Sequence, residues 1–238
     1  MFTTACDAFF PFPTQSLQLT HKNLTMHHLS PLKWKKVKAD NLDLDFCSQF
    51  YLKEEADELI RRLETDIEYF TGDLAKVFVF GKWHNVPRKQ ATFGEPGLSY
   101  KFSGISAPSR PWPKVLLEIK EKVSKACNKD FNLYNDGNDY MAEHRDNEKE
   151  LDPHTPIASL SFGQARDFIF THGSTKKKDK SPNSTKIPPV KFVLNHGSLL
   201  LMNHPTNIYW YHSLPRRKTA TGVRINLTFR KVIKSKCS

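Results

Sequence analysis

The sequence predicts a mainly β fold with flanking helices, built as a sandwich or a jelly-roll barrel. Short apolar stretches of strand length recur at close spacing in the C-terminal half, whereas only two stretches place apolar residues at helical spacing. Many short strands in succession are typical of these architectures. The predicted strands cover residues 77–80, 157–162, 167–171, 190–194, 198–202, 208–211 and 223–230.

The two predicted helices cover residues 53–70 and 113–126. The first repeats apolar residues at helical spacing through Leu59, Leu63 and Ile67. The second does so through Leu116 and other apolar residues, and it begins near a proline, which the first turn of a helix tolerates. These helices are expected to pack on the strands that follow them.

The length of 238 residues suits one domain and a short tail. Residues 1–38 are predicted to be a basic tail, and residues 39–238 a single domain. The tail ends in a lysine-rich stretch, residues 33–38, which is interpreted as a nuclear address, a phosphate contact or an ordinary solvated charge cluster. We expect no membrane segment, since no apolar run is long enough for a membrane helix.

Charge and cysteine content restrict the class of protein. Thirty-six Lys and Arg against 25 Asp and Glu leave a net charge of +11. Such an excess favours a polyanionic partner, although a merely basic surface would give the same count. The four cysteines are scattered without a CxxC pair. This argues against a disulfide framework and a zinc knuckle, and it fits an intracellular protein.

The last predicted strand has two chemically different faces. Arg224, Asn226, Thr228 and Arg230 alternate with three apolar residues, so all four polar side chains share one face. The planar fork of arginine suits a carboxylate. The pattern therefore indicates a polar pocket for an anion, with an exposed sheet face as the alternative.

A metal site is indicated by an imidazole and a carboxylate two residues apart. His144 and Asp146 would lie on the same side of an extended segment. Two histidines and one carboxylate leave open positions on an iron ion for a co-substrate and oxygen. The spacing leaves the third ligand open among five histidines further along the chain: His154, His172, His196, His204 and His212.

At this point the chain resembles the AlkB family of nucleic-acid dealkylating dioxygenases, and most of all its animal and plant branch that repairs duplex DNA. The similarity runs from about residue 78 to residue 232. It rests on six motifs in the same order: FGKWHNVPRKQ at 80–90, YKFSG at 100–104, EHRD at 143–146, NHPTN at 203–207, WYHSLP at 210–215 and RINLTFR at 224–230.

The resemblance implies a double-stranded β-helix (jelly-roll) dioxygenase core that uses Fe(II), 2-oxoglutarate and O2. A nucleotide-recognition lid would occupy about residues 75–110. The residues that match the iron ligands are His144, Asp146 and His212. Those that match the 2-oxoglutarate contacts are Asn132, Tyr134, Arg224, Asn226 and Arg230.

The resemblance also implies the reaction. The family oxidises the N-methyl group of 1-methyladenine or 3-methylcytosine in DNA, and releases formaldehyde, succinate and CO2. The base must leave the duplex to be reached. The residues that match substrate contacts are Phe80 as the wedge in the duplex, Tyr100, Phe102 and Glu148 around the base, and Arg88, Gln90, Arg217 and Lys218. A nuclear monomer acting on double-stranded DNA is expected.

The chain departs from the family just before Asn132. The apolar run that precedes the Asn-x-Tyr pair is about five residues shorter here, and the missing stretch would be a core strand. Two alternatives follow: a catalytically impaired protein that only binds nucleic acid, and an enzyme that acts on RNA. A protein hydroxylase fits less well with the charge and the base-pocket aromatics.

Overall fold

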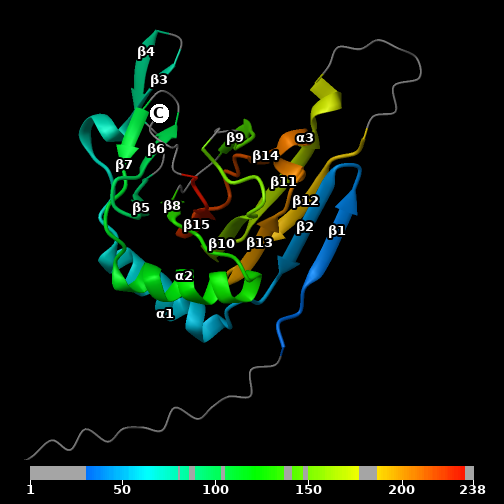
Figure 1. Cartoon of the computed structure of the whole chain (residues 1–238), viewed down its shortest axis with the longest axis horizontal. Coiled ribbons are helices and arrows are strands. Elements are labelled where there is room, and N and C mark those ends of the chain that lie inside the picture. The colour runs from blue at the N-terminus through cyan, green and yellow to red at the C-terminus, as the bar shows by residue number, and fades with distance from the viewer. Residues whose placement is uncertain are drawn as a thin grey trace, which may run out of the picture. The chain divides into compact units, whose positions relative to one another are not determined.

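The computed structural model of the chain describes residues 31–79, 81–85, 89–102, 105–136, 141–146, 150–176 and 187–233 (Figure 1). For a few residues inside strands, only the backbone is described. The unit that begins at Leu32 contains two facing β-sheets, two long helices and two small hairpins. None of the helices in these ranges is both long and apolar enough to cross a membrane.

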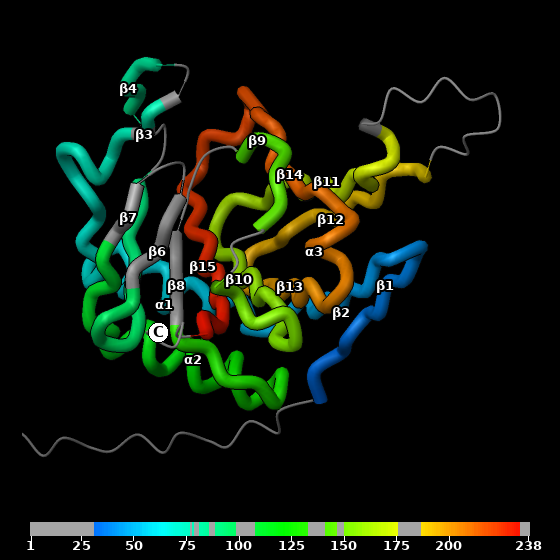
Figure 2. Tube along the Cα trace, turned by 45° about the horizontal axis from the view of Figure 1, so that its top comes forward, coloured from blue at the N-terminus to red at the C-terminus, as the bar shows by residue number. Residues whose placement is uncertain are grey.

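The larger sheet has seven strands in the order β1-β2-β13-β10-β15-β8-β5, and the smaller has four in the order β12-β11-β14-β9 (Figure 2). All strand pairs in both sheets are antiparallel. The strands of the larger sheet are β1 Lys35–Ala39, β2 Leu42–Cys47, β5 Thr92–Gly94, β8 Leu133–Asp136, β10 Ile157–Gly163, β13 Ser198–Met202 and β15 Arg224–Arg230. Those of the smaller sheet are β9 Met141–His144, β11 Arg166–His172, β12 Val190–Leu194 and β14 Trp210–Leu214.

The two long helices cover the outer face of the larger sheet. They are α1 Lys53–Asp66 and α2 Lys114–Cys127, which lie side by side under that sheet in Figure 1. Glu55 begins α1 by accepting a hydrogen bond from the Leu52 backbone N–H at 3.0 Å, which satisfies an amide that the helix leaves without a partner. Buried residues of both helices, such as Leu63 and Ile119, pack against Phe162 and Phe229 of the sheet in one core cluster.

A second core cluster fills part of the space between the two sheets. It joins Leu200 and Met202 of β13 to Phe168 and Phe170 of β11, and includes the fully buried Trp210 of β14. β13 therefore sends alternate residues into different cores, as the period of two along a strand requires. The two facing antiparallel sheets confirm the jelly-roll prediction. The apolar residues of β10 and β15 pack toward the helices, so their polar residues face the space between the sheets.

Six predicted strands and both helices are confirmed with boundaries that shift by at most a few residues. The strands are β3 Lys76–Val79, β10, β11, β12, β13 and β15. The first helix ends at Asp66 instead of residue 70, because Ile67 and Phe70 continue in extended form into the core. The strand predicted at 208–211 is wrong at its start. Residues 206–209 form a short helical turn, α3 Thr206–Tyr209, and β14 begins only at Trp210.

The lysine-rich stretch forms strand β1, at the edge of the larger sheet, so the described unit begins before residue 39. Lys36 forms ion pairs with Asp43 and Asp45 of β2, and Lys38 pairs with Asp43. A lysine-rich edge also discourages pairing with a second chain. The ion pairs are partly exposed and contribute little to stability, but they explain why a stretch of such polarity forms a strand.

The region between residues 75 and 110 forms two small hairpins and one strand of the larger sheet. The hairpins pair β3 Lys76–Val79 with β4 Lys82–Asn85, and β6 Ser99–Phe102 with β7 Ile105–Pro108. In Figure 1 both hairpins stand at the β5 side of the sheet, above α1 and α2. A short 3-10 turn, Gly72–Ala75, precedes β3, and a second, Gly173–Lys176, follows β11.

Candidate metal centre and co-substrate site

Three side chains converge between the sheets at the place where β9 ends. His144 is the last residue of β9 and lies directly opposite His212 of β14, and their ring centroids are 4.3 Å apart. Asp146 follows two residues later, and one ligand atom from each of the three residues lies within 4.8 Å of the others. The structure therefore selects His212 as the third member of the cluster.

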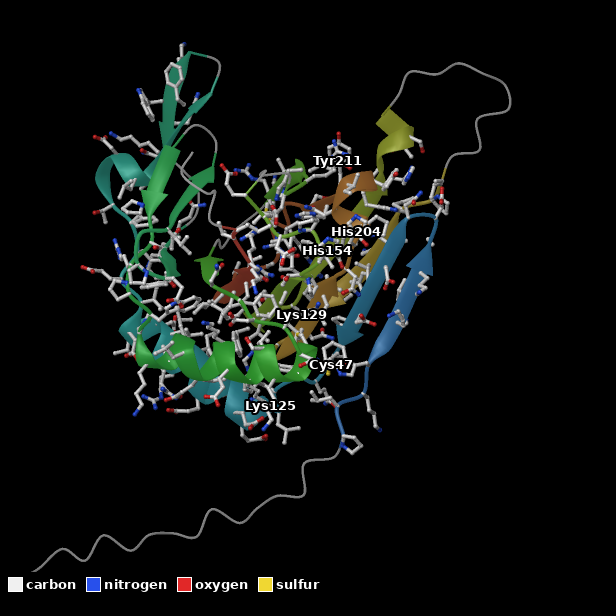
Figure 3. The ribbon with its side chains drawn as sticks, in the orientation of Figure 1. Cys47, Lys125, Lys129, His154, His204 and Tyr211 are labelled. Atoms are coloured by element: carbon white, nitrogen blue, oxygen red, sulfur yellow. The ribbon has the colours of Figure 1, made fainter. Side chains whose placement is uncertain are left out.

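The other four candidate histidines lie elsewhere. His196 contacts Asp57 of α1 at 3.1 Å, and the ring of His172 stacks on Tyr209 with centroids 6.3 Å apart. His154 and His204 lie near each other and line one surface hollow (Figure 3). None of them is within the cluster formed by the described residues.

His212 is held in a dry, aromatic environment. The side chain is 3 % exposed, and the Phe168 and Phe170 rings lie 5.5 and 6.2 Å from the imidazole, centroid to centroid. Burial lowers the pKa of His212 to about 4, although Asp146 opposes the change. The imidazole is therefore neutral near pH 7, and a neutral imidazole is the form that binds a metal.

His144 presents one defined nitrogen to the cluster. Its Nδ1 lies 2.9 Å from the carbonyl oxygen of Ala142, which can only accept, so Nδ1 carries the proton. This hydrogen bond leaves Nε2 with its lone pair, 3.5 Å from Oδ1 of Asp146. Burial alone would lower the pKa of His144, but the contacts with Asp146 outweigh it and raise that pKa.

Asp146 is a buried carboxylate whose two oxygens have different surroundings. Arg230 holds Oδ2 with two hydrogen bonds, from Nε at 3.1 Å and from Nη2 at 2.7 Å. Burial alone would raise the pKa of the carboxyl group, but Arg230 and the two histidines hold it well below its usual range. Oδ1, on the His144 side, is the oxygen placed to bind a metal.

The donor set fits a divalent metal ion. Two imidazole nitrogens and one carboxylate oxygen on one side of the site match the ligand set of non-haem Fe(II) centres. The charge of the carboxylate and the neutrality of His212 both favour a cation. Arg230 and the Ala142 carbonyl orient two of the three ligands through the atoms that do not face the metal, as outer partners in metal sites commonly do.

A row of hydrogen-bonded polar side chains extends from this centre along β15 and β10. Arg224 donates from Nη2 to the Asn226 Oδ1 at 2.8 Å and to the Ser161 hydroxyl at 3.1 Å. Asn226 also accepts from Ser159 and donates to Thr228. Arg224 is 7 % exposed, as is Asn226. The alternative of an exposed sheet face is therefore wrong, and the row can present a fixed guanidinium to an anion.

Asn132 does not lie in this row. Its amide nitrogen donates to the Val232 carbonyl at 2.8 Å, and its amide oxygen accepts from the Val232 N–H at 2.7 Å. The Asn132 side chain therefore closes the end of the ladder beyond Arg230. The predicted 2-oxoglutarate contact of Asn132 stays a prediction, since an amide group can make further hydrogen bonds beyond these two.

Tyr134 lies in β8, of which only the backbone is described. Backbone pairing places residue 134 opposite Phe93 of β5 and Phe229 of β15, so β8 pairs on both sides. The predicted 2-oxoglutarate contact of Tyr134 stays a prediction.

The predicted substrate residues are only partly described. Phe80, Arg88 and Glu148 lie outside the described residues, and Tyr100 and Phe102 are placed in β6 by their backbone alone. Gln90 is 3 % exposed, and its backbone carbonyl accepts from the Phe70 N–H. Its predicted substrate contact stays a prediction. Arg217 and Lys218 are exposed in the turn before β15.

Sequence reasoning missed three residues of the site: Ser159, Ser161 and Asn207. The two serines alternate with the apolar residues of β10, which is the same signal that identified the polar face of β15. Asn207 is the last residue of the NHPTN motif, but the motif assigned it no role, because its contact with Asp146 joins segments 61 positions apart in the sequence.

Comparisons with known proteins agree with this geometry. Residues 43–230 match the 2OG-Fe(II) oxygenase superfamily. The human protein named DNA oxidative demethylase ALKBH2 is 50 % identical over 214 residues, which cover 88 % of this chain and 80 % of that protein. The protein of the same name from Mus musculus is 50 % identical over 208 residues, 85 % of each chain.

A solved structure, titled "The structure of OsALKBH1", matches with a TM-score of 0.53 and 16 % identity, over 84 % of this chain and all of that one. At that identity it supports the fold alone. The match over residues 43–230 includes the cluster of His144, Asp146 and His212, and the two relatives are 50 % identical over most of this chain. The chain therefore belongs to the 2OG-Fe(II) oxygenase superfamily and, within it, to the AlkB family of dioxygenases.

Proposed function

We propose that this protein is an Fe(II)- and 2-oxoglutarate-dependent dioxygenase that demethylates 1-methyladenine and 3-methylcytosine in duplex DNA, releasing formaldehyde, succinate and CO2. The observation that carries the proposal is the cluster of His144, Asp146 and His212, in which Arg230 holds Asp146 from the strand that also carries the buried Arg224. Relatives of about 50 % identity are named DNA oxidative demethylases, which favours DNA as the substrate.

Each part of the site has a definite task in this reaction. Iron(II) held by His144, Asp146 and His212 would supply the oxidation of the methyl group by O2, coupled to decarboxylation of 2-oxoglutarate. Arg224 would bind the distal carboxylate of 2-oxoglutarate with its planar fork, and Asn226 and Ser161 fix the orientation of that fork. The phenylalanines around His212 keep water away from the metal side. No protein nucleophile is needed.

The two hairpins between residues 75 and 110 are assigned to nucleic-acid contact. Phe78 and Trp83 on the β3–β4 hairpin are 52 % and 60 % exposed, and their ring centroids are 5.2 Å apart. Exposed aromatic rings beside Lys82 suit a surface that contacts bases and phosphates. We assign Phe80, between these strands, as the wedge that replaces the flipped base, and Tyr100, Phe102 and Glu148 to the base pocket.

The first test compares two histidines. His144→Ala is expected to reduce formaldehyde release from a duplex carrying 1-methyladenine below detection, because the metal loses one of three ligands. His154→Ala, which removes an exposed histidine outside the cluster, should retain wild-type turnover. Turnover by the His144→Ala protein would refute the proposal. Comparison of wild-type rates on methylated duplex, single-stranded DNA and RNA separates the proposed substrate from the alternatives.

A second test concerns the β3–β4 hairpin. Trp83→Ala is expected to weaken binding of duplex DNA by about tenfold, the effect of one lost aromatic stacking contact. Fluorescence anisotropy with a labelled duplex measures it. Leu117→Ser on α2 is the matched control, since Leu117 is also exposed and lies on the opposite side of the fold. Equal losses in both variants would show that the hairpin has no particular role.

We also propose a nuclear monomer. The lysines of the β1 edge support the monomeric state, since charges at a sheet edge oppose association. Lys36 and Lys38 form ion pairs with Asp43 and Asp45. An import receptor that binds the 33–38 stretch would therefore have to recognise it as a β-strand. Sedimentation of the purified chain tests the monomer, and imaging of a fluorescent fusion tests the location.

A further inference from the structure

We propose that Asn207 is the positioning residue of the metal centre, because its single side-chain amide replaces the strand partner that the backbone of Asp146 lacks. The proposal rests on the metal centre of the proposed function and is independent of which nucleic acid is the substrate. Among the described residues, Asn207 forms no hydrogen bond with His144 or His212. It acts on the carboxylate ligand through the main chain.

The need for such a residue follows from the ladder between β9 and β14. His144 is paired with His212, and β9 ends there. Asp146, two residues further on, has left the strand. The register would place it opposite Trp210, the first residue of β14, but no strand pair forms between these two residues. A buried backbone N–H and carbonyl beyond the last strand pair must find other partners.

Asn207 supplies both of them. The Asp146 N–H donates to the Asn207 Oδ1 at 3.0 Å, and the Asn207 Nδ2 donates to the carbonyl oxygen of Asp146. These are the two hydrogen bonds that a directly opposed strand residue exchanges in an antiparallel pair. The amide is the smallest side chain with a donor and an acceptor side by side, so no other residue type of similar size could supply both.

The residues on both sides of Asn207 are bound to the β1–β2 hairpin. The Asp43 N–H donates to the Thr206 hydroxyl at 2.8 Å, and that hydroxyl donates to the Asp43 carbonyl oxygen at 3.0 Å. The Trp210 indole donates to the Asp40 carbonyl at 2.9 Å. The turn that carries Asn207 is therefore fastened to β2 and its preceding turn, which gives the amide a fixed base from which to hold Asp146.

Arg145 makes a further contact between the segment of the metal ligands, residues 144–146 (the metal loop), and the turn that carries Asn207. Arg145 donates to the carbonyl oxygen of Ile208, and its guanidinium lies over the Tyr211 ring, 4.5 Å from the centroid. Tyr211 lies on β14 beside β9 (Figure 3). Arg230 fixes the carboxylate of Asp146, whereas Asn207 fixes its backbone. Without Asn207 the carboxylate would pivot about Arg230, and Oδ1 would lose its position relative to the two imidazoles.

The experiment measures metal affinity and backbone exposure, and neither readout depends on catalysis. Binding of Mn(II) alone is followed by the EPR signal of the free ion. Asn207→Ala is expected to weaken Mn(II) binding by about 10- to 100-fold, the usual effect of losing an outer partner of a metal ligand. Hydrogen exchange of the metal-free protein should rise sharply in the peptide that contains Asp146.

Asn203→Ala is the matched control. It removes an amide from the same turn that contacts Asp43 and Asp45 and does not contact the metal loop. We expect Mn(II) binding within about twofold of wild type and unchanged exchange at Asp146, even if both variants melt at similarly lowered temperatures. Wild-type Mn(II) affinity in Asn207→Ala would overturn the proposal, and so would an equal loss in Asn203→Ala.

If Asn207→Ala fails to reach the wild-type circular dichroism spectrum, Asn207→Asp takes its place. Aspartate keeps the shape and can accept from the Asp146 N–H, but it cannot donate to the Asp146 carbonyl. Weaker Mn(II) binding than in Asn203→Ala is again expected, and equal binding overturns the proposal. Loss of DNA demethylation with intact Mn(II) and exchange data would instead count against the proposed substrate.

Discussion

Asp146→Ala should abolish metal binding and lower the free energy of unfolding by about 3–5 kcal/mol, the usual cost of removing one partner of a buried ion pair. Asp146 is 4 % exposed, and two hydrogen bonds join its Oδ2 to Arg230, which is 6 % exposed. The truncation removes a metal ligand and at the same time takes from Arg230 the carboxylate that compensates its charge. Urea unfolding of the metal-free protein measures the second effect.

Asp146→Asn separates the two roles. An amide of the same shape can turn its oxygen toward Arg230, which has only donors, so part of the stability should be kept. The amide nitrogen then faces His144 and the metal, where a donor cannot act as a ligand. We therefore expect no Mn(II) binding in either variant, but a smaller loss of stability for Asn than for Ala.

The control for this pair is Asp167→Asn on β11. Asp167 forms an ion pair with Lys191 at 3.0 Å, in which both side chains are partly exposed. Such a pair contributes about 0–1 kcal/mol, and the site is not involved. Metal binding by either Asp146 variant would show that Asp146 is not a required metal ligand. Equal losses of stability in Asp146→Ala and Asp167→Asn would show that the buried Asp146–Arg230 pair does not stabilise the fold more than an exposed pair does.

What the sequence could predict depended on local patterns. The alternation in β15 placed Arg224 and Asn226 on one face, because side chains along a strand have a fixed period of two. This pattern can be recognised without knowing which strands pair with β15. The same holds for the apolar repeat of α1 and α2. The pair of His144 and Asp146 was visible for the same reason, whereas the choice of His212 required the family resemblance or the fold.

What the sequence could not predict depended on partners far along the chain. The register of β8 against Phe93 and Phe229 is set by pairing across the sheet. The turn at 206–209 looks like a strand from its apolar residues, yet contacts with Asp43 and Asp146 hold it as a turn. One misplaced residue of register moves a side chain to the other face of a sheet.

The segment between α2 and β8 also depends on distant partners. After α2, Asn128 adopts a left-handed conformation that asparagine tolerates, and the fully buried Phe131 packs 6.1 Å from Phe229, centroid to centroid. The chain then enters β8, which pairs with β5 and β15. The shortening expected before Asn132 therefore leaves a strand in this place.

Arg224→Met is expected to weaken binding of 2-oxoglutarate by about 100-fold or more, measured by calorimetry on protein loaded with Mn(II) in place of iron. Each hydrogen bond from a charged group contributes about 1.5–3 kcal/mol, and a bidentate contact makes two. Arg224→Lys keeps the charge and loses the fork, so its affinity should lie between those of wild type and Met.

Arg166→Met is the matched control for Arg224, because Arg166 is also 7 % exposed but donates to the Pro215 carbonyl instead of lying in the polar row. It should lose stability and keep its affinity for 2-oxoglutarate. The decisive comparison uses 2-oxobutyrate, which lacks the distal carboxylate. If Arg224 binds that carboxylate, wild type prefers 2-oxoglutarate strongly, and the preference falls to about one in Arg224→Met because the variant cannot recognise the missing group. A preserved preference would place the distal carboxylate elsewhere and leave the hydrogen-bonded row of β15 and β10 with a purely structural role.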